Sequence, residues 1–194
     1  MFSNHREIEL KVLSSKIYTI AWSNSGTMLA AGDYEGKVRI WKPESTKESF
    51  ELVKNNSHVT KLCWSPTNEE HLAVATFDKI LNIFNVSKKA PVNVFHTFGG
   101  NINMSWSPDG KYLAVGNRDD CLTIYNLQTG ATLSHTKFNF EINEMCWDNS
   151  VSEFFLATGK GPILVFKFPE MTQLRELSGH ITNCYSIDMD PSVS

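Results

Sequence analysis

Six histidines, four cysteines and the adjacent aspartates Asp119 and Asp120 are the side chains of this sequence considered for catalysis or metal binding. Imidazole and carboxylate groups act as acids and bases, and thiolates and imidazoles bind zinc. The histidines are scattered, no cysteines have C-x-x-C spacing, and the sequence contains no HExxH, GxSxG or glycine-rich phosphate loop. Asp119 and Asp120 would point to opposite faces of a strand. The sequence therefore predicts no enzyme, no metal site, no cofactor and no small-molecule substrate.

Composition and charge exclude further classes. The formal net charge of −3 gives no overall basic field of the kind that binds nucleic acid without sequence preference. No apolar run approaches the roughly 18–20 residues that cross a bilayer, and residues 1–11 lack the apolar segment of a secretory signal. The cysteines are expected to be small buried residues in a reducing compartment, with a disulfide or zinc site as alternatives. Direct nucleic-acid binding and membrane association are not expected.

Four tryptophans divide the chain into repeated units. Spacings of 42, 42 and 41 residues separate Trp22, Trp64, Trp106 and Trp147. A second aromatic closes each unit, at Trp41, Phe84, Tyr125 and Phe166. A period of about 40–45 residues that ends in an aromatic is typical of WD-repeat propellers. The repeat tryptophans and Trp41 are predicted to be structural residues of the core.

Each unit breaks into four short strands separated by turn residues. The first strands are expected at Ile17–Trp22, Val59–Trp64, Ile102–Trp106 and Ile142–Trp147. Second strands such as Leu29–Gly32 are apolar on both faces, which indicates that both faces of each sheet are covered. No stretch keeps a 3.6-residue apolar period, so no helix is expected. The sequence predicts an all-β fold, an incomplete WD40 β-propeller.

The units are expected at about 14–56, 57–98, 99–139 and 140–178, with a fifth at 179–194 that holds only a first strand. A complete ring of seven blades at this period needs about 300 residues. An open arc leaves strand edges and blade faces uncovered. The chain is therefore interpreted as a truncated product that would be unstable or prone to aggregate alone.

The units depart from a typical WD repeat in their polar residues. The aspartate of the closing Trp-Asp pair is replaced by Lys42, Asn85, Asn126 and Lys167. Typical repeats also carry an aspartate between the second and third strands, where it bonds a buried histidine. Asp78 and Asp119 occupy that position and are given a structural role, and His58 is either a displaced partner or an exposed loop residue. These blades should depend mainly on hydrophobic packing.

Several segments are more specific than the period. Gly100–Gly110 reads GNINMSWSPDG, and it is followed by Ala114–Asp120, Phe138–Trp147 and Phe154–Gly161. This ordered set resembles the THO complex subunit 3 family, the WD-repeat subunits of a nuclear assembly that couples transcription to mRNA export. The resemblance extends over essentially the whole chain and is strongest from Gly100 to Pro191. It implies a seven-bladed propeller that binds larger THO subunits and has no catalytic activity.

Propellers bind partners through loops at the ends of their central channel. One face collects the loop before each first strand and the loop between the second and third strands. Those loops contribute the candidate partner-binding residues Lys16, Tyr34, His58, Phe77, Asn101, Arg118, Glu141 and Lys160. Tyr34 and Arg118 are of types enriched in binding hot spots. An ordinary solvated loop residue is the alternative for each, and Asn101 could instead satisfy backbone groups of a turn.

The resemblance implies a nuclear scaffold subunit of a THO/TREX-type complex that acts in mRNA processing and export through protein–protein contacts. A cytosolic WD-repeat adaptor in a signalling or ubiquitin-ligase assembly is the alternative. A propeller that binds RNA directly is a third hypothesis, and the negative net charge argues against it.

Overall fold

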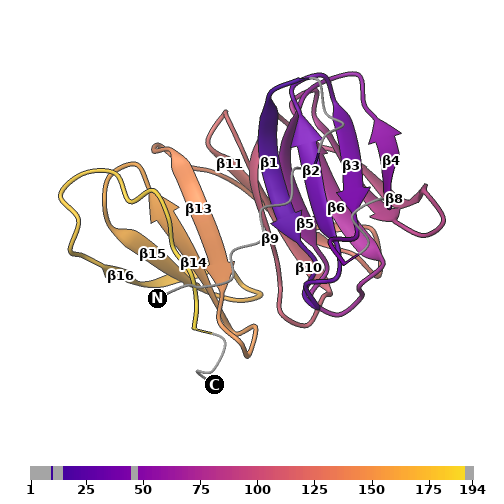
Figure 1. The fold of residues 1–194 in the computed structure, drawn as a ribbon. Coiled ribbons are helices and arrows are strands. Elements are labelled where there is room, and N and C mark those ends of the chain that lie inside the picture. The colour runs from indigo at the N-terminus through magenta and orange to yellow at the C-terminus, as the bar shows by residue number, and fades with distance from the viewer. Residues whose placement is uncertain (1–9, 11–14, 45–47, 191–194) are drawn as a thin grey trace, which may run out of the picture.

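The computed structural model describes residue 10, residues 15–44 and residues 48–190 of the 194-residue chain. Four antiparallel sheets contain four strands each, and every sheet keeps its strands in chain order (Figure 1). The strands are β1 (Ile17–Trp22), β2 (Leu29–Asp33), β3 (Lys37–Trp41), β4 (Ser49–Lys54), β5 (Val59–Trp64), β6 (His71–Thr76), β7 (Ile80–Asn85), β8 (Ala90–His96), β9 (Asn101–Trp106), β10 (Tyr112–Asn117), β11 (Cys121–Asn126), β12 (Thr132–Lys137), β13 (Ile142–Trp147), β14 (Glu153–Thr158), β15 (Ile163–Lys167) and β16 (Thr172–Leu177). The predicted all-β fold is confirmed, and within the described ranges the sheets form an open arc.

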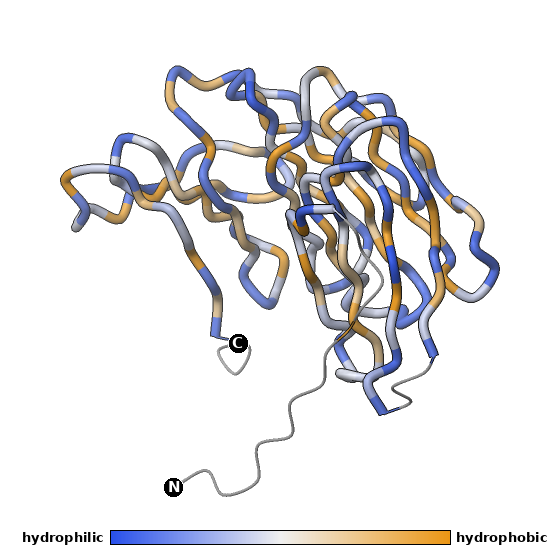
Figure 2. The backbone as a smooth tube through the Cα atoms, turned by 45° about the horizontal axis from the view of Figure 1, so that its top comes forward, coloured by the Kyte–Doolittle hydropathy of each residue, from blue (hydrophilic) through white to orange (hydrophobic). Residues whose placement is uncertain are grey.

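The sheets are arranged as successive blades. β1 contacts β5, β5 contacts β9, and β9 contacts β13, so the first strands lie along the inner side of the arc. Figure 1 shows the fourth sheet, orange to yellow, extending away from the other three. The second strands are buried along almost their whole length, as the apolar pattern predicts, whereas β16 is exposed throughout. Figure 2 shows hydrophobic stretches along the strands and hydrophilic residues at many of the turns.

The tryptophan at the end of each first strand joins its blade to the preceding one. The indole N–H of Trp64 donates a hydrogen bond to the Ala21 carbonyl oxygen at 3.0 Å. The same bond runs from Trp106 to the Cys63 carbonyl at 3.1 Å and from Trp147 to the Ser105 carbonyl at 3.3 Å. These three indoles are buried. The 42-residue period therefore reflects a contact that is repeated between blades.

Trp22 departs from the prediction that the repeat tryptophans are core residues. It is 52% exposed, and Ile17 and Ile20 on the same strand are also exposed. Its local sequence matches that of the other repeats, but β1 is the first described strand of the arc, and no described blade packs on its outer face. Burial of this tryptophan depends on a neighbouring blade, which local sequence does not encode.

A polar residue at the end of each second strand closes the following turn. The Asp33 carboxylate accepts a hydrogen bond from the Lys37 N–H at 2.8 Å, and the Asn117 side-chain oxygen accepts one from the Cys121 N–H at 3.0 Å. The hydroxyls of Thr76 and Thr158 donate to carbonyl oxygens four residues later, at 3.0 and 2.7 Å. All four side chains are buried. This repeated feature was not predicted, because three different residue types fill the position.

Residues 179–190 lie against the fourth sheet without forming a strand. The Cys184 N–H donates to the Thr158 carbonyl at 3.1 Å, and the Asn143 amide donates to the Cys184 carbonyl at 2.9 Å. Ile187 and Met189 pack against the hydrophobic cluster that contains Cys146. The segment thus occupies the side of the blade on which a next first strand would lie. The end of the proposed fifth unit, residues 191–194, lies outside the described residues.

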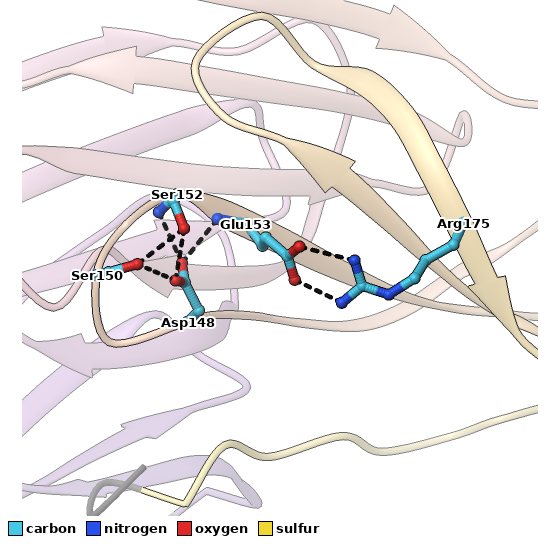
Figure 3. Close-up of polar contacts among 5 residues, drawn as sticks. All are labelled: Asp148, Ser150, Ser152, Glu153 and Arg175. Atoms are coloured by element: carbon cyan, nitrogen blue, oxygen red, sulfur yellow. Dashed lines mark hydrogen bonds and ion pairs between the residues drawn. The ribbon is translucent and has the colours of Figure 1, made fainter. Parts of the chain in front are cut away.

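The turn between β13 and β14 is organised by one carboxylate (Figure 3). Asp148 accepts hydrogen bonds from the N–H groups of Ser152 and Glu153, both at 2.7 Å, and from the hydroxyls of Ser150 and Ser152. The Arg175 guanidinium then holds Glu153 through two bonds of 2.7 and 2.6 Å. Partial burial raises the pKa of Asp148, but the hydrogen bonds outweigh it and hold the pKa below its ordinary value.

This lowered pKa predicts a loss of stability in acid. A group whose pKa falls on folding stabilises the fold above its unfolded pKa, about 3.9, and that stabilisation is lost as the pH falls through the lower folded value. Asp148→Asn is expected to reduce the free energy of unfolding by about 1 kcal/mol at pH 7. Urea unfolding at pH 7 and pH 3 measures the difference, which should shrink at the lower pH. An equal difference at both pH values would contradict this assignment.

Candidate partner-binding face

Four rings from two neighbouring sheets meet at one end of the arc, and we call them the aromatic cluster: Tyr18, Tyr34, His58 and Phe77. His58 is central, with its ring centroid 5.3 Å from Tyr34 and 4.7 Å from Phe77 in stacked geometry. Tyr18 contacts both Tyr34, at 6.0 Å, and His58, at 5.4 Å. The cluster connects the β2–β3 turn and β1 of the first sheet to the β6–β7 turn of the second through the loop before β5.

A β-bulge places Tyr18 in this cluster. The pairing of β1 with β2 passes from Ile17 to Thr19 and leaves Tyr18 unpaired. The equivalent residue is skipped in every other first strand, and these residues are Thr60, Ile102 and Asn143. Bulges re-aim side chains and are frequent beside functional sites. Tyr18 could not be predicted from the sequence, because the bulge depends on strand register.

A cation covers each end of the cluster. The Lys16 ammonium lies 5.4 Å from the Tyr18 ring centroid, and the Arg118 guanidinium lies 5.3 Å from that of Phe77. Cation–π contacts of this kind are worth about 0.5–1 kcal/mol at exposed sites. A Cβ on Gly100 would lie 3.0 Å from the Phe77 carbonyl oxygen and 3.2 Å from its ring. A glycine in the loop before β9 therefore leaves room for Phe77 to extend toward Arg118.

A hollow of about 580 Å³ continues the face beyond Arg118. Asp120 and Glu141 supply carboxylates to its wall, and Phe77 and Arg118 form the side nearest the cluster. The Asn103 amide donates to the carbonyl oxygens of Ile142, at 3.3 Å, and Asn143, which ties β9 to β13 at its base. Positive and negative side chains thus occupy successive positions along one face.

The structure brings most of the predicted partner-binding residues together. In or beside the aromatic cluster lie Lys16, Tyr34, His58, Phe77 and Arg118. Glu141 lines the adjoining hollow. Lys160 makes its contacts outside the aromatic cluster. Its ammonium donates to Asn139 at 2.9 Å and lies 5.6 Å from the Phe140 ring centroid. Binding by any of these residues stays a prediction.

Asn101 does not belong to this face. It is 0% exposed, and its amide donates to the Thr76 and Ile80 carbonyl oxygens, both at 3.0 Å. Asn101 is the first residue of β9, and the loop position itself is filled by Gly100. The alternative reading, that this side chain satisfies backbone groups of a turn, is confirmed, and it links the second and third blades.

The two predicted turn aspartates are exposed. The Asp78 carboxylate lies 2.6 Å from the Thr76 hydroxyl, which shares its hydrogen between this carboxylate and the Ile80 carbonyl oxygen, so the partner of Asp78 is a threonine and not a histidine. Asp119 follows Asn117, whose side-chain oxygen accepts its N–H at 3.0 Å. His58 packs between rings of the aromatic cluster. These contacts do not support the hypothesis that it is the displaced hydrogen-bond partner of a turn aspartate.

The residues that the structure describes contain no group of three or more histidine, cysteine, aspartate or glutamate side chains placed to hold a metal ion. Burial raises the pKa of the Cys63 thiol to about 11 and that of Cys146 to about 12, so both are poor nucleophiles at neutral pH. Over the same ranges, no helix has the length and apolar character required to span a membrane.

Comparison with known families agrees with this architecture. Residues 8–42 match the family described as WD domain, G-beta repeat, and residues 99–150 match the Anaphase-promoting complex subunit 4 WD40 domain. The first match contains β1, β2 and β3 of the first sheet, and the second contains the whole third sheet together with β13 of the fourth. The chain is a WD40-repeat protein. Members of this repeat family are typically non-catalytic scaffolds that bind other proteins.

This WD40-repeat protein is related to THO complex subunit 3. It is 36% identical to THO complex subunit 3 of Arabidopsis thaliana over 180 residues, which cover 91% of the chain and 57% of the relative. It is 32% identical to WD repeat-containing protein AAC3 of Dictyostelium discoideum, over 91% of the chain and 43% of the relative. Meiotic fizzy-related protein 1 of Schizosaccharomyces pombe is 20% identical over 92% of the chain. The chain thus spans about half the length of these curated relatives.

Proposed function

We propose that this chain acts as a WD40-repeat scaffold in a nuclear THO/TREX-type complex that couples transcription and processing to mRNA export. The observation that supports this best is the 36% identity to THO complex subunit 3 across 91% of the chain. The gathering of five loop residues on one face supports binding to protein subunits over catalysis. In this proposal the blades are a rigid support and the loops carry the contacts.

A second function deserves a test because a specific observation favours it. Residues 99–150 match a WD40 domain of an anaphase-promoting complex subunit, and a fizzy-related protein is similar over most of the chain. A role as an adaptor in another multi-subunit assembly, including a cytosolic one, would agree with these matches. The identity to the fizzy-related protein is only 20%, which favours the THO-type function.

Affinity purification distinguishes the two functions. The tagged chain, purified from RNase-treated nuclear and cytosolic extracts, is expected to recover other THO subunits from the nuclear fraction, as identified by mass spectrometry. The same tag on an unrelated WD40-repeat protein is the matched control. Recovery of anaphase-promoting complex subunits without THO subunits would refute the proposal. RNase treatment ensures that any recovered subunit is bound by protein contacts.

A further inference from the structure

Each ring of the aromatic cluster has another ring or a cation over one of its faces. His58 stacks between Tyr34, with 13° between the ring planes, and Phe77, with 23°. Lys16 lies over Tyr18, and Arg118 lies over Phe77. Single-stranded nucleic acids bind such surfaces by stacking bases on free aromatic faces. These contacts reduce the free ring face available to a base, and the cluster also presents ring edges and hydroxyl groups to a ligand.

The ring edges and the flanking cations both carry positive charge. An aromatic ring carries partial positive charge at its edge. Tyr34 is 57% exposed and Tyr18 is half exposed, so their edges and O–H donors are accessible. None of the ion pairs found among the described residues involves Lys16 or Arg118. The cluster and its two cations together form a strip that bridges three blades and carries one cation at each end.

We infer that this strip binds an extended acidic segment of a protein partner. Carboxylates of the segment pair with Lys16 and Arg118, and its backbone carbonyls accept hydrogen bonds from the tyrosine hydroxyls. Asp120 and Glu141 in the adjoining hollow repel further acidic residues and limit the segment to the strip. The inference rests on the proposed protein-binding function and adds the chemistry of the partner.

Fluorescence anisotropy of the 194-residue chain with a labelled glutamate-rich decapeptide tests this assignment. The same decapeptide with glutamine in place of glutamate is the ligand control. Arg118→Glu and Lys16→Glu are each expected to weaken binding of the acidic peptide about tenfold, because each reverses one pairing charge. Lys160→Glu makes the same charge change on an exposed residue outside the strip and should alter binding less than twofold. Circular dichroism confirms that each exposed-site variant keeps its fold.

Substitutions of Tyr34 distinguish a specific binding site from general electrostatic attraction. Tyr34→Ala is expected to weaken binding of the acidic peptide about fivefold. Tyr34→Phe keeps the ring and should recover the part of that affinity that depends on the ring. Equal weakening by Lys160→Glu and Arg118→Glu, or no preference for glutamate over glutamine, would overturn the inference. Tighter binding of a labelled oligouridine than of the peptide, lost in Arg118→Glu, would assign the strip to nucleic acid instead. Recovery of THO subunits is measured separately, so failure of either experiment leaves the other result interpretable.

Discussion

Trp147→Ala is expected to lower the free energy of unfolding by about 4 kcal/mol. The indole is 3% exposed, and its ring centroid lies 4.8 Å from those of both Phe154 and Phe168. Its N–H also donates to the Ser105 carbonyl of the preceding blade, which would lose that partner. The substitution thus opens a cavity and weakens the contact between the third and fourth blades. Urea unfolding followed by circular dichroism measures the change.

Trp22→Ala is the matched control, because it makes the same substitution at the same repeat position. Trp22 is 52% exposed, and no described blade supplies a carbonyl for its indole. The expected change is about 1 kcal/mol or less. Similar effects of the two substitutions would show that the tryptophans act within their own sheets, against the interblade contact described above.

The strands could be predicted because their determinants are local. Turn residues and alternating apolar residues recur with the period, and β1, β5 and β13 have the expected bounds. Exposure of Trp22 could not be predicted in this way, since its sequence context is that of the buried copies. The turn-closing side chains of Asp33, Thr76 and Asn117 were missed for the opposite reason. They share a hydrogen-bonding role but not a residue type.

The candidate site was predictable as a set of loops but not as a set of contacts. Repeat position alone places Tyr34, Phe77 and Arg118 at equivalent turns of successive blades, and propeller geometry brings such turns to one face. Asn101 was misassigned because β9 begins one residue earlier than expected. Tyr18 was missed because a bulge, set by strand register, directs it to this face. Both differences amount to a shift of one residue, which changes the face on which a strand side chain lies.

The β2–β3 turn that carries Tyr34 depends on a glycine. Gly36 has a φ of 88°, and a Cβ there would lie 2.5 Å from the Asn55 carbonyl oxygen and 2.6 Å from that of Ser57. Its own carbonyl accepts hydrogen bonds from the Asn55 N–H at 2.8 Å and from the Asn55 amide at 2.9 Å. Gly161 repeats this arrangement in the fourth blade, with a φ of 109° and the His180 carbonyl oxygen 2.5 Å from a Cβ. A glycine at this position lets the turn approach the loop that leads to the next blade.

Gly36→Ala is therefore expected to lower the free energy of unfolding by about 3 kcal/mol, from left-handed backbone strain of about 1–2 kcal/mol plus displacement of two backbone carbonyls. Gly130→Ala is the control, because Gly130 has a φ of 71° but nothing within 4 Å of an added Cβ. It should show only the strain, about 1 kcal/mol. Urea midpoints of the two variants measure the difference. Equal shifts would mean that the loop containing Asn55 and Ser57 can move at little cost in free energy. The turn would then be too flexible to hold Tyr34 against His58.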